Sequence, residues 1–196
     1  MTRFFDFVFS FLGIIILSPL ILLITLINIF ETKFRPFFFQ KRVGKNGVLF
    51  QLVKFRTMYS NPDNRIFVTV SNRDRRITKF GYFLRRYKLD EIPQLFNVIL
   101  GDMSLVGPRP EVMEYVNFYS AEQMKTLNVR PGITDYASIE YFNENEMLSS
   151  AIDPEKTYIE EIMPKKIELN QKYISDHSLK HYFLILFLTI KRIFTS

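Results

Sequence analysis

The chain has 196 residues, of which 47% are hydrophobic, and a formal net charge of +6 at pH 7. This length suits one domain, and the apolar content is sufficient to bury a core. The absence of cysteine excludes disulfides, thiolate metal ligands and thiol catalysis. His177 and His181 lie far from the acidic pair at 90 and 91, which disfavours a histidine-based zinc site or triad. The positive charge indicates an anionic partner: nucleic acid, a membrane surface or a phosphorylated substrate.

The first predicted element is a nearly continuous apolar segment over residues 4–30. It is long enough to span a bilayer, which needs roughly 20 residues, whereas the apolar region of a signal peptide has about 7–15 and ends at a cleavage site not evident here. Ser18-Pro19 lies in mid-segment, where proline removes a helical hydrogen bond at a cost of about 3 kcal/mol or more. We expect Ser18 to offset part of this cost by donating to a freed backbone carbonyl.

The flanks of this segment favour one of two arrangements in the membrane. Basic residues lie on both sides of it: Arg3 before, and Lys33, Arg35, Lys41, Arg42 and Lys45 after. Positive charge favours the cytoplasmic side, so both ends are expected to remain there. An ordinary proline-kinked span would place them on opposite sides. A helix that bends at Ser18-Pro19 and enters and leaves through one leaflet satisfies both constraints, and we predict this re-entrant arrangement.

Residues 37–58 predict a β-hairpin, because two apolar runs flank Asn46-Gly47, a strong hairpin signal. In a second strand from Val48 to Thr57, alternation places Lys54 and Arg56 on one face. Two cations at one end of an otherwise apolar face suit a phosphate group beside a membrane surface. A solvated strand end is equally consistent with this pattern.

A polar connection follows, with a predicted turn at 61–64 and a charge cluster at 72–76. No known nucleic-acid-binding motif accompanies the cluster, so nucleic acid is not expected as a partner. Residues 77–87 then show apolar side chains at helical spacing, which predicts an amphipathic helix. Such a helix would carry Arg85 and Arg86 toward the acidic pair that follows.

Asp90 and Glu91 form this acidic pair at the head of a predicted helix. Apolar residues recur at three- and four-residue steps over 89–99, Pro93 fits only a first helical turn, and Gly101 is a natural C-terminal stop. We therefore expect Asp90 to lie near the positive end of the helix dipole, which favours its ionised form. Such a carboxylate is a candidate nucleophile, metal ligand or partner of a cation, although an ordinary helix N-cap is a common alternative.

The segment Gly107-Pro108-Arg109-Pro110 holds an arginine between two prolines. The prolines have a fixed φ, and residues that precede a proline are biased toward extended backbone. A guanidinium on so stiff a segment suits bidentate contact with phosphate, although a rigid surface turn could have the same sequence. Carboxylates, several cations and this arginine all lie within residues 85–109, which suggests a site for a phosphate ester and a divalent metal.

The last part of the chain is predicted to be mainly helical. Residues 111–127 predict an amphipathic helix, and residues 154–174 a charged helix interrupted at Pro164. The apolar run at 182–190 is too short to span a bilayer, so we expect a helix that lies in the membrane interface or packs on the core.

Several of these stretches together resemble the bacterial monotopic phosphoglycosyl transferases, the initiating sugar-phosphate transferases of glycoconjugate assembly. The resemblance rests on the following stretches: Gln40 to Gly44, Lys54 to Met58, Lys88 to Leu95, Asn97 to Ser104, Val106 to Glu111 and Arg130 to Thr134. It covers almost the whole chain, and the length matches the minimal catalytic members. The chain departs from the commonest family pattern over Asp135 to Glu146, where many relatives have a Gly-Trp-Ala-Gln stretch, and this leaves the sugar unassigned.

The resemblance implies an α+β, monotopic membrane protein in three parts. These are a re-entrant helix over 1–35 broken at Ser18-Pro19, a catalytic core with a small β-hairpin over 36–150, and C-terminal helices over 151–196 that pack on the core and the membrane interface. The implied location is the bacterial inner (cytoplasmic) membrane, in contact with its lipids, with the active site facing the cytoplasm. The oligomeric state is left open, with a homodimer as one option.

The resemblance also implies transfer of a phosphosugar from a UDP-sugar to polyprenol phosphate, with Mg²⁺, releasing UMP. Asp90 would attack the β-phosphorus and form a covalent aspartyl-phosphosugar. Asp90 and Glu91 would be the metal ligands, and Glu91 could alternatively act as a base toward the acceptor. The cations expected to bind substrate phosphate or nucleotide are Lys54, Arg56, Arg85, Arg86, Arg109 and Arg130.

Two other functions fit the same sequence. In a membrane-bound nucleotide-sugar pyrophosphatase, water would replace the lipid acceptor. In a non-catalytic membrane module, the basic surface would only bind acidic partners. Measuring UMP release with and without polyprenol phosphate separates all three.

Overall fold

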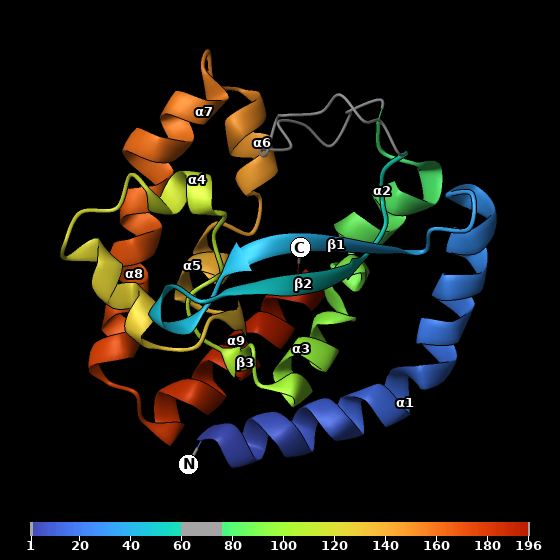
Figure 1. The fold of residues 1–196 in the computed structure, drawn as a ribbon, viewed down its shortest axis with the longest axis horizontal. Coiled ribbons are helices and arrows are strands. Elements are labelled where there is room, and N and C mark those ends of the chain that lie inside the picture. The colour runs from blue at the N-terminus through green and yellow to red at the C-terminus, as the bar shows by residue number, and fades with distance from the viewer. Residues whose placement is uncertain (1, 60–75, 196) are drawn as a thin grey trace.

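The computed structural model describes residues 2–59 and 76–195, so the turn predicted at 61–64 and most of the charge cluster at 72–76 lie outside the described residues. Helices and two small sheets alternate along the chain (Figure 1). In chain order the elements are α1 (Thr2–Glu31), β1 (Phe37–Val43), η1 (Lys45–Gly47), β2 (Leu49–Phe55), α2 (Lys79–Arg86), η2 (Leu89–Glu91), α3 (Gln94–Leu100), β3 (Ser104–Val106), α4 (Met113–Val116), η3 (Gln123–Asn128), β4 (Gly132–Thr134), α5 (Tyr136–Glu140), α6 (Glu144–Ser149), α7 (Pro154–Thr157), η4 (Tyr158–Ile162), α8 (Met163–Ser175) and α9 (Leu179–Thr195).

The N-terminal helix α1 is long and mostly exposed, and it contains Pro19. By length and composition it could cross a membrane. In Figure 1 it runs along the lower edge of the molecule and then turns upward. Pro19 has no N–H to donate to the carbonyl of Ile15, and the Ser18 hydroxyl donates to that carbonyl instead, at 2.8 Å. This confirms the predicted compensation by Ser18.

The N-terminal end of α1 is bonded to elements that lie far along the sequence. The Arg3 guanidinium donates to the carbonyl of Ile99, at the end of α3, at 3.0 Å. The buried Asp6 carboxylate accepts from the Ser104 hydroxyl at 2.8 Å, from the Leu105 N–H at 2.9 Å and from the Tyr182 hydroxyl at 2.8 Å. These bonds join α1 to α3, β3 and α9.

The C-terminal end of α1 is bonded to the same body of the protein. The side-chain amide of Asn28 donates to the carbonyls of Pro36, at 3.2 Å, and Arg56, at 3.0 Å. The Glu31 carboxylate accepts from the N–H of Phe80 at 3.2 Å, at the start of α2. Both ends of this apolar helix are therefore attached to one body, although the middle of the helix is exposed.

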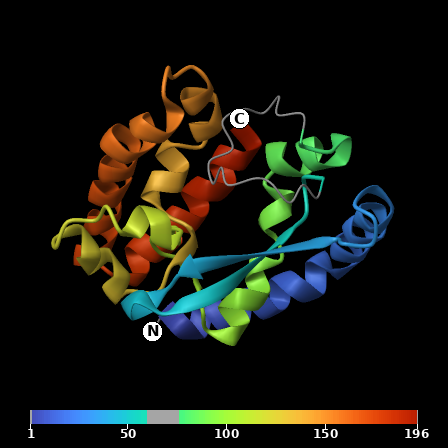
Figure 2. The ribbon, with the colours of Figure 1, turned by 45° about the horizontal axis from the view of Figure 1, so that its top comes forward.

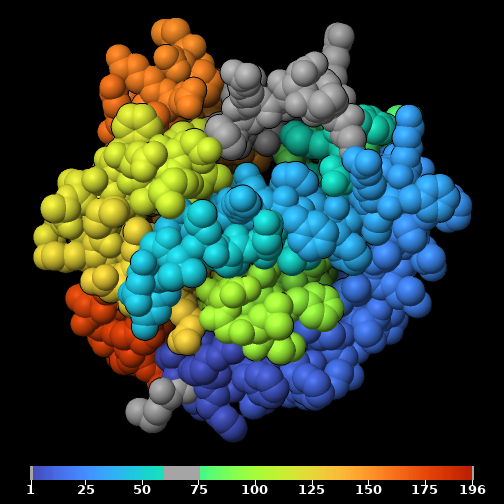
Figure 3. Space-filling model, in the orientation of Figure 1, coloured from blue at the N-terminus to red at the C-terminus, as the bar shows by residue number. Residues whose placement is uncertain are grey.

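The predicted hairpin is confirmed, since β1 and β2 pair antiparallel from Phe37 opposite Phe55 to Val43 opposite Leu49. Its turn contains Asn46 with φ 57° and Gly47 with φ 78°, the left-handed backbone that Asn-Gly favours. In Figure 3 the hairpin, in cyan and light blue, crosses one face between α1 and the yellow segment that contains η3.

A second sheet pairs β3 with β4 in parallel, with Ser104 opposite Gly132. Gly107, just after β3, lies very close to Gly132, the first residue of β4. A Cβ on Gly132 would lie 2.1 Å from the Gly107 nitrogen, so no larger residue fits there. This contact, together with the bond from the Gly132 N–H to the Pro108 carbonyl at 2.9 Å, fixes the start of the Pro108-Arg109-Pro110 segment against the start of β4.

The last helix packs on the core, in agreement with one of the two arrangements predicted for it. Tyr182 and Ile185 are fully buried in a cluster that includes Leu52 and Val98, whereas Phe187 and Phe194 on α9 are exposed. Figure 2 shows α9, in red, running diagonally between the orange helices and the green helices α2 and α3. It contributes to the same core as the hairpin and α3.

Two helix predictions need correction. The helix predicted over 111–127 is broken into α4 and η3, because Ser120 and Gln123 exchange backbone-to-side-chain hydrogen bonds of 2.8 and 3.3 Å that begin a new turn. The helix predicted to be interrupted at Pro164 continues through it. The irregularity is instead the π-helical turn η4, which comes just before Pro164 and accommodates the missing N–H.

Candidate active site

A single cleft of about 1740 Å³ is lined by both strands of the hairpin and by residues from α2, η2, α5, α6 and α9. Among the described residues, its lining contains twelve lysines and arginines and only five aspartates and glutamates. A cleft lined mainly by one sign of charge raises the local concentration of ligands of the opposite sign. The cleft is therefore built for an anionic ligand.

The acidic pair lies in a short 3₁₀ turn, not in the following helix. Lys88 has a left-handed backbone with φ 56°, and η2 then carries Asp90 and Glu91. Regular helix α3 begins only after Pro93 and ends at Gly101, whose φ is 98°. The predicted stop at Gly101 is confirmed, but the helix begins later than expected, and Asp90 is not its N-cap.

Asp90 is 8% exposed and lines the cleft. No residue in the described ranges donates a hydrogen bond to its carboxylate. Burial raises its pKa above the ordinary value; the attraction of Lys54 opposes this shift, and the adjacent Glu91 charge adds to it. The prediction that the helix dipole would favour the ionised form was wrong, because desolvation dominates at a residue that precedes the helix.

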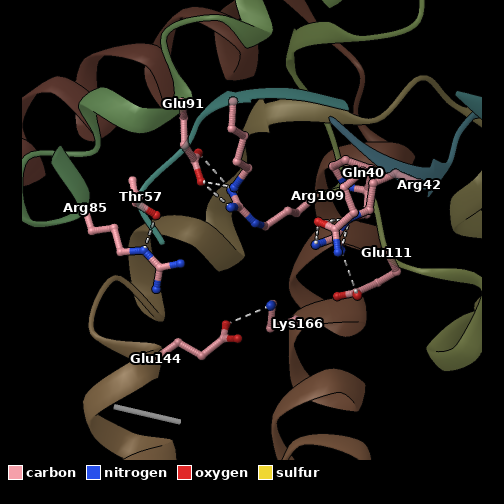
Figure 4. Close-up of polar contacts among 11 residues, drawn as sticks. Gln40, Arg42, Thr57, Arg85, Glu91, Arg109, Glu111, Glu144 and Lys166 are labelled. Atoms are coloured by element: carbon pink, nitrogen blue, oxygen red, sulfur yellow. Dashed lines mark hydrogen bonds and ion pairs between the residues drawn. The ribbon is translucent and has the colours of Figure 1, made fainter. Parts of the chain in front are cut away.

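Glu91 has the opposite environment. Its carboxylate accepts from both terminal nitrogens of Arg109, the Nη1–Oε2 distance being 3.2 Å, and from Lys54 Nζ at 2.8 Å (Figure 4). Burial alone would raise its pKa, but the positive charges of Arg109 and Lys54 outweigh burial and hold the pKa well below the ordinary value. The Glu91 charge raises the pKa of Arg109 in turn, despite burial. Both members of this ion pair are therefore charged.

The backbone of Arg109 is also fixed. Its N–H donates to the carboxylate of Asp135 at 3.1 Å, and Asp135, which is fully buried, also caps α5 by accepting from the Ser138 N–H. The sequence prediction did not include Asp135 in the site. Its position at the start of the stretch where the chain departs from its relatives was the available signal.

A second group of ionic side chains lines the cleft, and the sequence prediction missed it. Arg42 donates to the carbonyl of Pro110 at 3.1 Å and lies 3.6 Å from the Glu111 carboxylate, which also accepts from the Tyr158 hydroxyl.

Lys166 pairs with Glu144 at 2.8 Å, and Figure 4 shows this pair below the pair formed by Glu91 and Arg109. Arg42 and Glu111 belong to the motif stretches noted above, but nothing in the sequence indicated the contribution of α6 and α8.

The predicted cations from α2 lie in the cleft lining. Arg85 donates from Nε to the Thr57 hydroxyl at 2.8 Å, and its guanidinium lies in the cleft. The Arg86 guanidinium lies 5.7 Å from the centre of the Tyr87 ring. Lys54 contacts Glu91 as described, and the charges of Lys54 and Arg85 act on Asp90, so these two predicted cations join Arg109 near the acidic pair.

The remaining two predicted cations are placed differently. Arg56 lines the cleft but donates to the backbone carbonyls of Arg35 and Phe37, at 2.9 and 3.3 Å. Arg130 is exposed and lies outside the cleft lining, where it donates to the Gly101 carbonyl at 3.0 Å. The structure therefore does not bring Arg130 to the site, and its side chain is bonded to the C-terminal cap of α3 instead.

The described residues contain no group of three or more histidine, cysteine, aspartate or glutamate side chains that could hold a metal ion. Mg²⁺ is usually bound through one or two carboxylates together with substrate phosphates, so a larger cluster is not required. The Asp90 carboxylate, which lacks hydrogen-bond donors in the described ranges, fits one such ligand. Glu91 fits a second through Oε2, to which only Arg109 Nη1 donates among the described residues.

Together the fold and the site define a class of protein: an α+β protein with one long apolar N-terminal helix and a basic cleft that surrounds an acidic pair and a fixed arginine. The chain matches the family model described as bacterial sugar transferase over residues 1–196, and it belongs to that family. This confirms the family predicted from the sequence motifs, and with it the prediction of a sugar-phosphate transferase at the level of the family.

Three relatives illustrate the range of the family. The chain is 35% identical over 194 residues to the UDP-N-acetylgalactosamine-undecaprenyl-phosphate N-acetylgalactosaminephosphotransferase of Aeromonas hydrophila, covering 97% of this chain and 43% of the relative. It is 33% identical to the UDP-glucose:undecaprenyl-phosphate glucose-1-phosphate transferase of Caulobacter vibrioides, covering 99% of this chain and 70% of the relative. It is 32% identical to the transferase of the same name from Escherichia coli, covering 97% of this chain and 39% of the relative. The chain thus spans less than half the length of two of these relatives.

Proposed function

We propose that this chain transfers a phosphosugar from a UDP-sugar to polyprenol phosphate and releases UMP. The observation that carries this proposal is the buried Asp90, which receives no hydrogen bond from the described residues, in a basic cleft beside a glutamate held by Arg109. The relatives named above act on UDP-sugars and undecaprenyl phosphate, which supports the same substrate classes here. Because those relatives carry different sugars in their names, the sugar is not assigned.

In the proposed first step an oxygen of the Asp90 carboxylate attacks the β-phosphorus of the donor. The new Asp90–phosphorus bond forms as the bond to the UMP oxygen breaks, which leaves an aspartyl-phosphosugar and UMP. In the second step a phosphate oxygen of the lipid attacks the same phosphorus and expels the Asp90 carboxylate. Covalent catalysis of this kind replaces one difficult displacement by two easier ones.

The low pKa of Glu91 bears on its role. A carboxylate whose pKa lies well below the ordinary value is a weak base, so we infer that Glu91 serves as a metal ligand or partner of cations and not as the base toward the acceptor. Asp90 and Glu91 would hold Mg²⁺, which would offset negative charge on the diphosphate. Arg109 presents its planar fork to Glu91, and a donor phosphate would compete with Glu91 for that fork.

We also propose that α1 is re-entrant, in the bacterial inner membrane, with the cleft facing the cytoplasm. A straight helix of 30 residues would be about 45 Å long, so its ends would lie far apart. Bonds from Arg3 and Asp6 at one end, and from Asn28 and Glu31 at the other, attach both ends to one body. This supports an arrangement in which both ends lie on the same side of the membrane.

The reaction is tested by measuring UMP release from a panel of UDP-sugars, with and without polyprenol phosphate. The proposal expects turnover with one or a few sugars and only when the lipid is present. Release of UMP that does not depend on the lipid would indicate the pyrophosphatase. No release with any donor, from a folded protein, would leave a non-catalytic membrane module.

The topology is tested with single cysteines at Thr2 and Lys33 in this cysteine-free chain, labelled in intact cells with an impermeant thiol reagent. Lys33 is exposed, whereas Thr32 is buried and would label poorly. Neither position should label in the parent. Labelling at position 2 but not at position 33 would contradict the re-entrant arrangement. The Ser18→Ala/Pro19→Ala variant should gain a population that labels at position 2, because alanine at position 19 restores the hydrogen bond that proline cannot make.

A further inference from the structure

We propose that Lys88 and Arg192, held on the ring of Phe142, form a second phosphate site in the cleft, separate from the Arg109 fork. Lys88 precedes the acidic pair, Phe142 lies between α5 and α6, and Arg192 is near the end of α9. Lys88 Nζ lies 4.9 Å from the centre of the Phe142 ring, and the Arg192 guanidinium carbon 5.4 Å from it. All three residues line the cleft.

These two cations differ in their partners from Lys54, Arg109 and Lys166, which also line the cleft. Lys54 and Arg109 bind Glu91, and Lys166 binds Glu144. Within the described ranges, in contrast, no carboxylate oxygen lies within 4.0 Å of a nitrogen of Lys88 or Arg192. The Arg192 Nε is moreover buried, and no residue that the structure describes accepts a hydrogen bond from it.

An aromatic ring attracts each cation but supplies no net negative charge. Two positive charges on one ring therefore still repel each other, and a buried guanidinium N–H without an acceptor is unfavourable. An anion that contacts both side chains removes both penalties. Phosphate is suited to this role, because its oxygens accept from the planar fork of arginine and from the compact lysine ammonium.

The position of Lys88 connects this site to the reaction. Lys88 is two residues from Asp90, and its charge contributes to lowering the pKa of both Asp90 and Glu91 against the effect of burial. The proposed reaction brings two phosphorylated substrates to one cleft, and Arg109 presents a single fork. The identity of these substrates rests on the proposed function. The second site would take either the donor diphosphate or the lipid monophosphate.

Isothermal titration of the purified chain in detergent distinguishes these two sources. The probes are UDP and a short-chain polyprenyl monophosphate, and the variants are Lys88→Gln, Arg192→Gln and Lys191→Gln. Lys191 is the matched control, since it is the exposed neighbour of Arg192 on α9 and lies outside the cleft lining. We expect Lys88→Gln and Arg192→Gln each to weaken one probe about tenfold, which corresponds to ~1.4 kcal/mol, and Lys191→Gln to bind as the parent does.

Weaker binding of UDP alone assigns the site to the donor, and weaker binding of the lipid phosphate alone assigns it to the acceptor. Phe142→Leu keeps an apolar side chain but removes the ring, and it should weaken the same probe about threefold. The proposal is overturned if Arg192→Gln binds both probes as tightly as the parent, or if Lys191→Gln weakens them equally. Should Lys88→Gln not fold, Arg192→Gln near the helix end decides the matter. Because the measurement needs no turnover, a parent that binds without reacting would contradict the proposed function and not this site.

Discussion

Two buried aspartates, Asp6 and Asp90, show how the surroundings of a carboxylate decide whether it holds the fold together or is available for chemistry. Asp6 is 2% exposed and Asp90 8% exposed, so both have lost most of their hydration. Asp6 accepts hydrogen bonds from Ser104, Leu105 and Tyr182, whereas none of the described residues donates one to Asp90. Burial without donors is costly for an ionised carboxylate, and it leaves the oxygens of Asp90 available to a ligand.

The difference extends to the elements around each carboxylate. Asp6 joins α1 to β3 and α9, so its bonds determine where the long apolar helix meets the core. Asp90 lies in the 3₁₀ turn η2 and lines a large cleft, where it feels the charge of Lys54, which already binds Glu91. Loss of the Asp6 carboxylate should therefore lower the stability of the fold, whereas loss of the Asp90 carboxylate should lower the activity.

The largest effect is expected for Asp90→Asn. An amide is a poor nucleophile, so turnover and the covalent adduct should fall on the order of 10³-fold or more. The melting temperature at neutral pH should not fall, because the variant removes a buried charge that lacks hydrogen-bond donors in the described ranges. Incubation with labelled UDP-sugar and intact-mass measurement checks the adduct, and full activity of this variant would end the assignment of Asp90 as nucleophile.

A second effect, in the same region, concerns the geometry of Arg109. Arg109→Ala should reduce activity on the order of 10²-fold, and Arg109→Lys should recover little of it, because lysine keeps the charge but lacks the planar fork. Steady-state rates of the two variants and the parent provide the test. Equal rates for Arg109→Lys and the parent would mean that the Pro-Arg-Pro segment is structural.

In the Asp6 region the expected effect is on stability. Asp6→Ala leaves three donors unsatisfied and should lower the free energy of unfolding by about 3 kcal/mol or more, whereas Tyr182→Phe removes one donor and should cost about 1–2 kcal/mol. Thermal unfolding in detergent measures both. A melting temperature of Asp6→Ala equal to that of the parent would show that this junction contributes no net stability, and the contrast with Asp90 would then fail.

The comparison also shows which features could be predicted from sequence. The Ser18 hydrogen bond, the Asn46-Gly47 hairpin and the Gly101 stop depend on neighbours within a few residues, and the structure confirms them. The partners of Asp6 lie 98 and 176 residues away in the chain, so no local pattern indicates them. The prediction for the pKa of Asp90 failed for the same reason, because elements that are distant in the sequence bury this carboxylate.

The smallest expected effect is a pH dependence of stability with opposite signs at the two members of the acidic pair. The folded pKa of Asp90 is raised above its unfolded value, so its ionisation destabilises the fold at neutral pH and the penalty disappears as the pH falls toward 3.8. Asp90→Asn should therefore gain stability over the parent at pH 7, and the gain should shrink on acidification.

The folded pKa of Glu91 is lowered, so Glu91 contributes stability above its unfolded value near 4.5 and loses it as the pH falls through the folded value. Glu91→Gln should thus be less stable than the parent at pH 7, and its deficit should narrow only below the unfolded value. Melting temperatures of both variants and the parent between pH 7 and the acid limit of folding test the pair. A change of the same sign in both variants would contradict the assignment of one desolvated and one ion-paired carboxylate, since only opposite environments give opposite slopes.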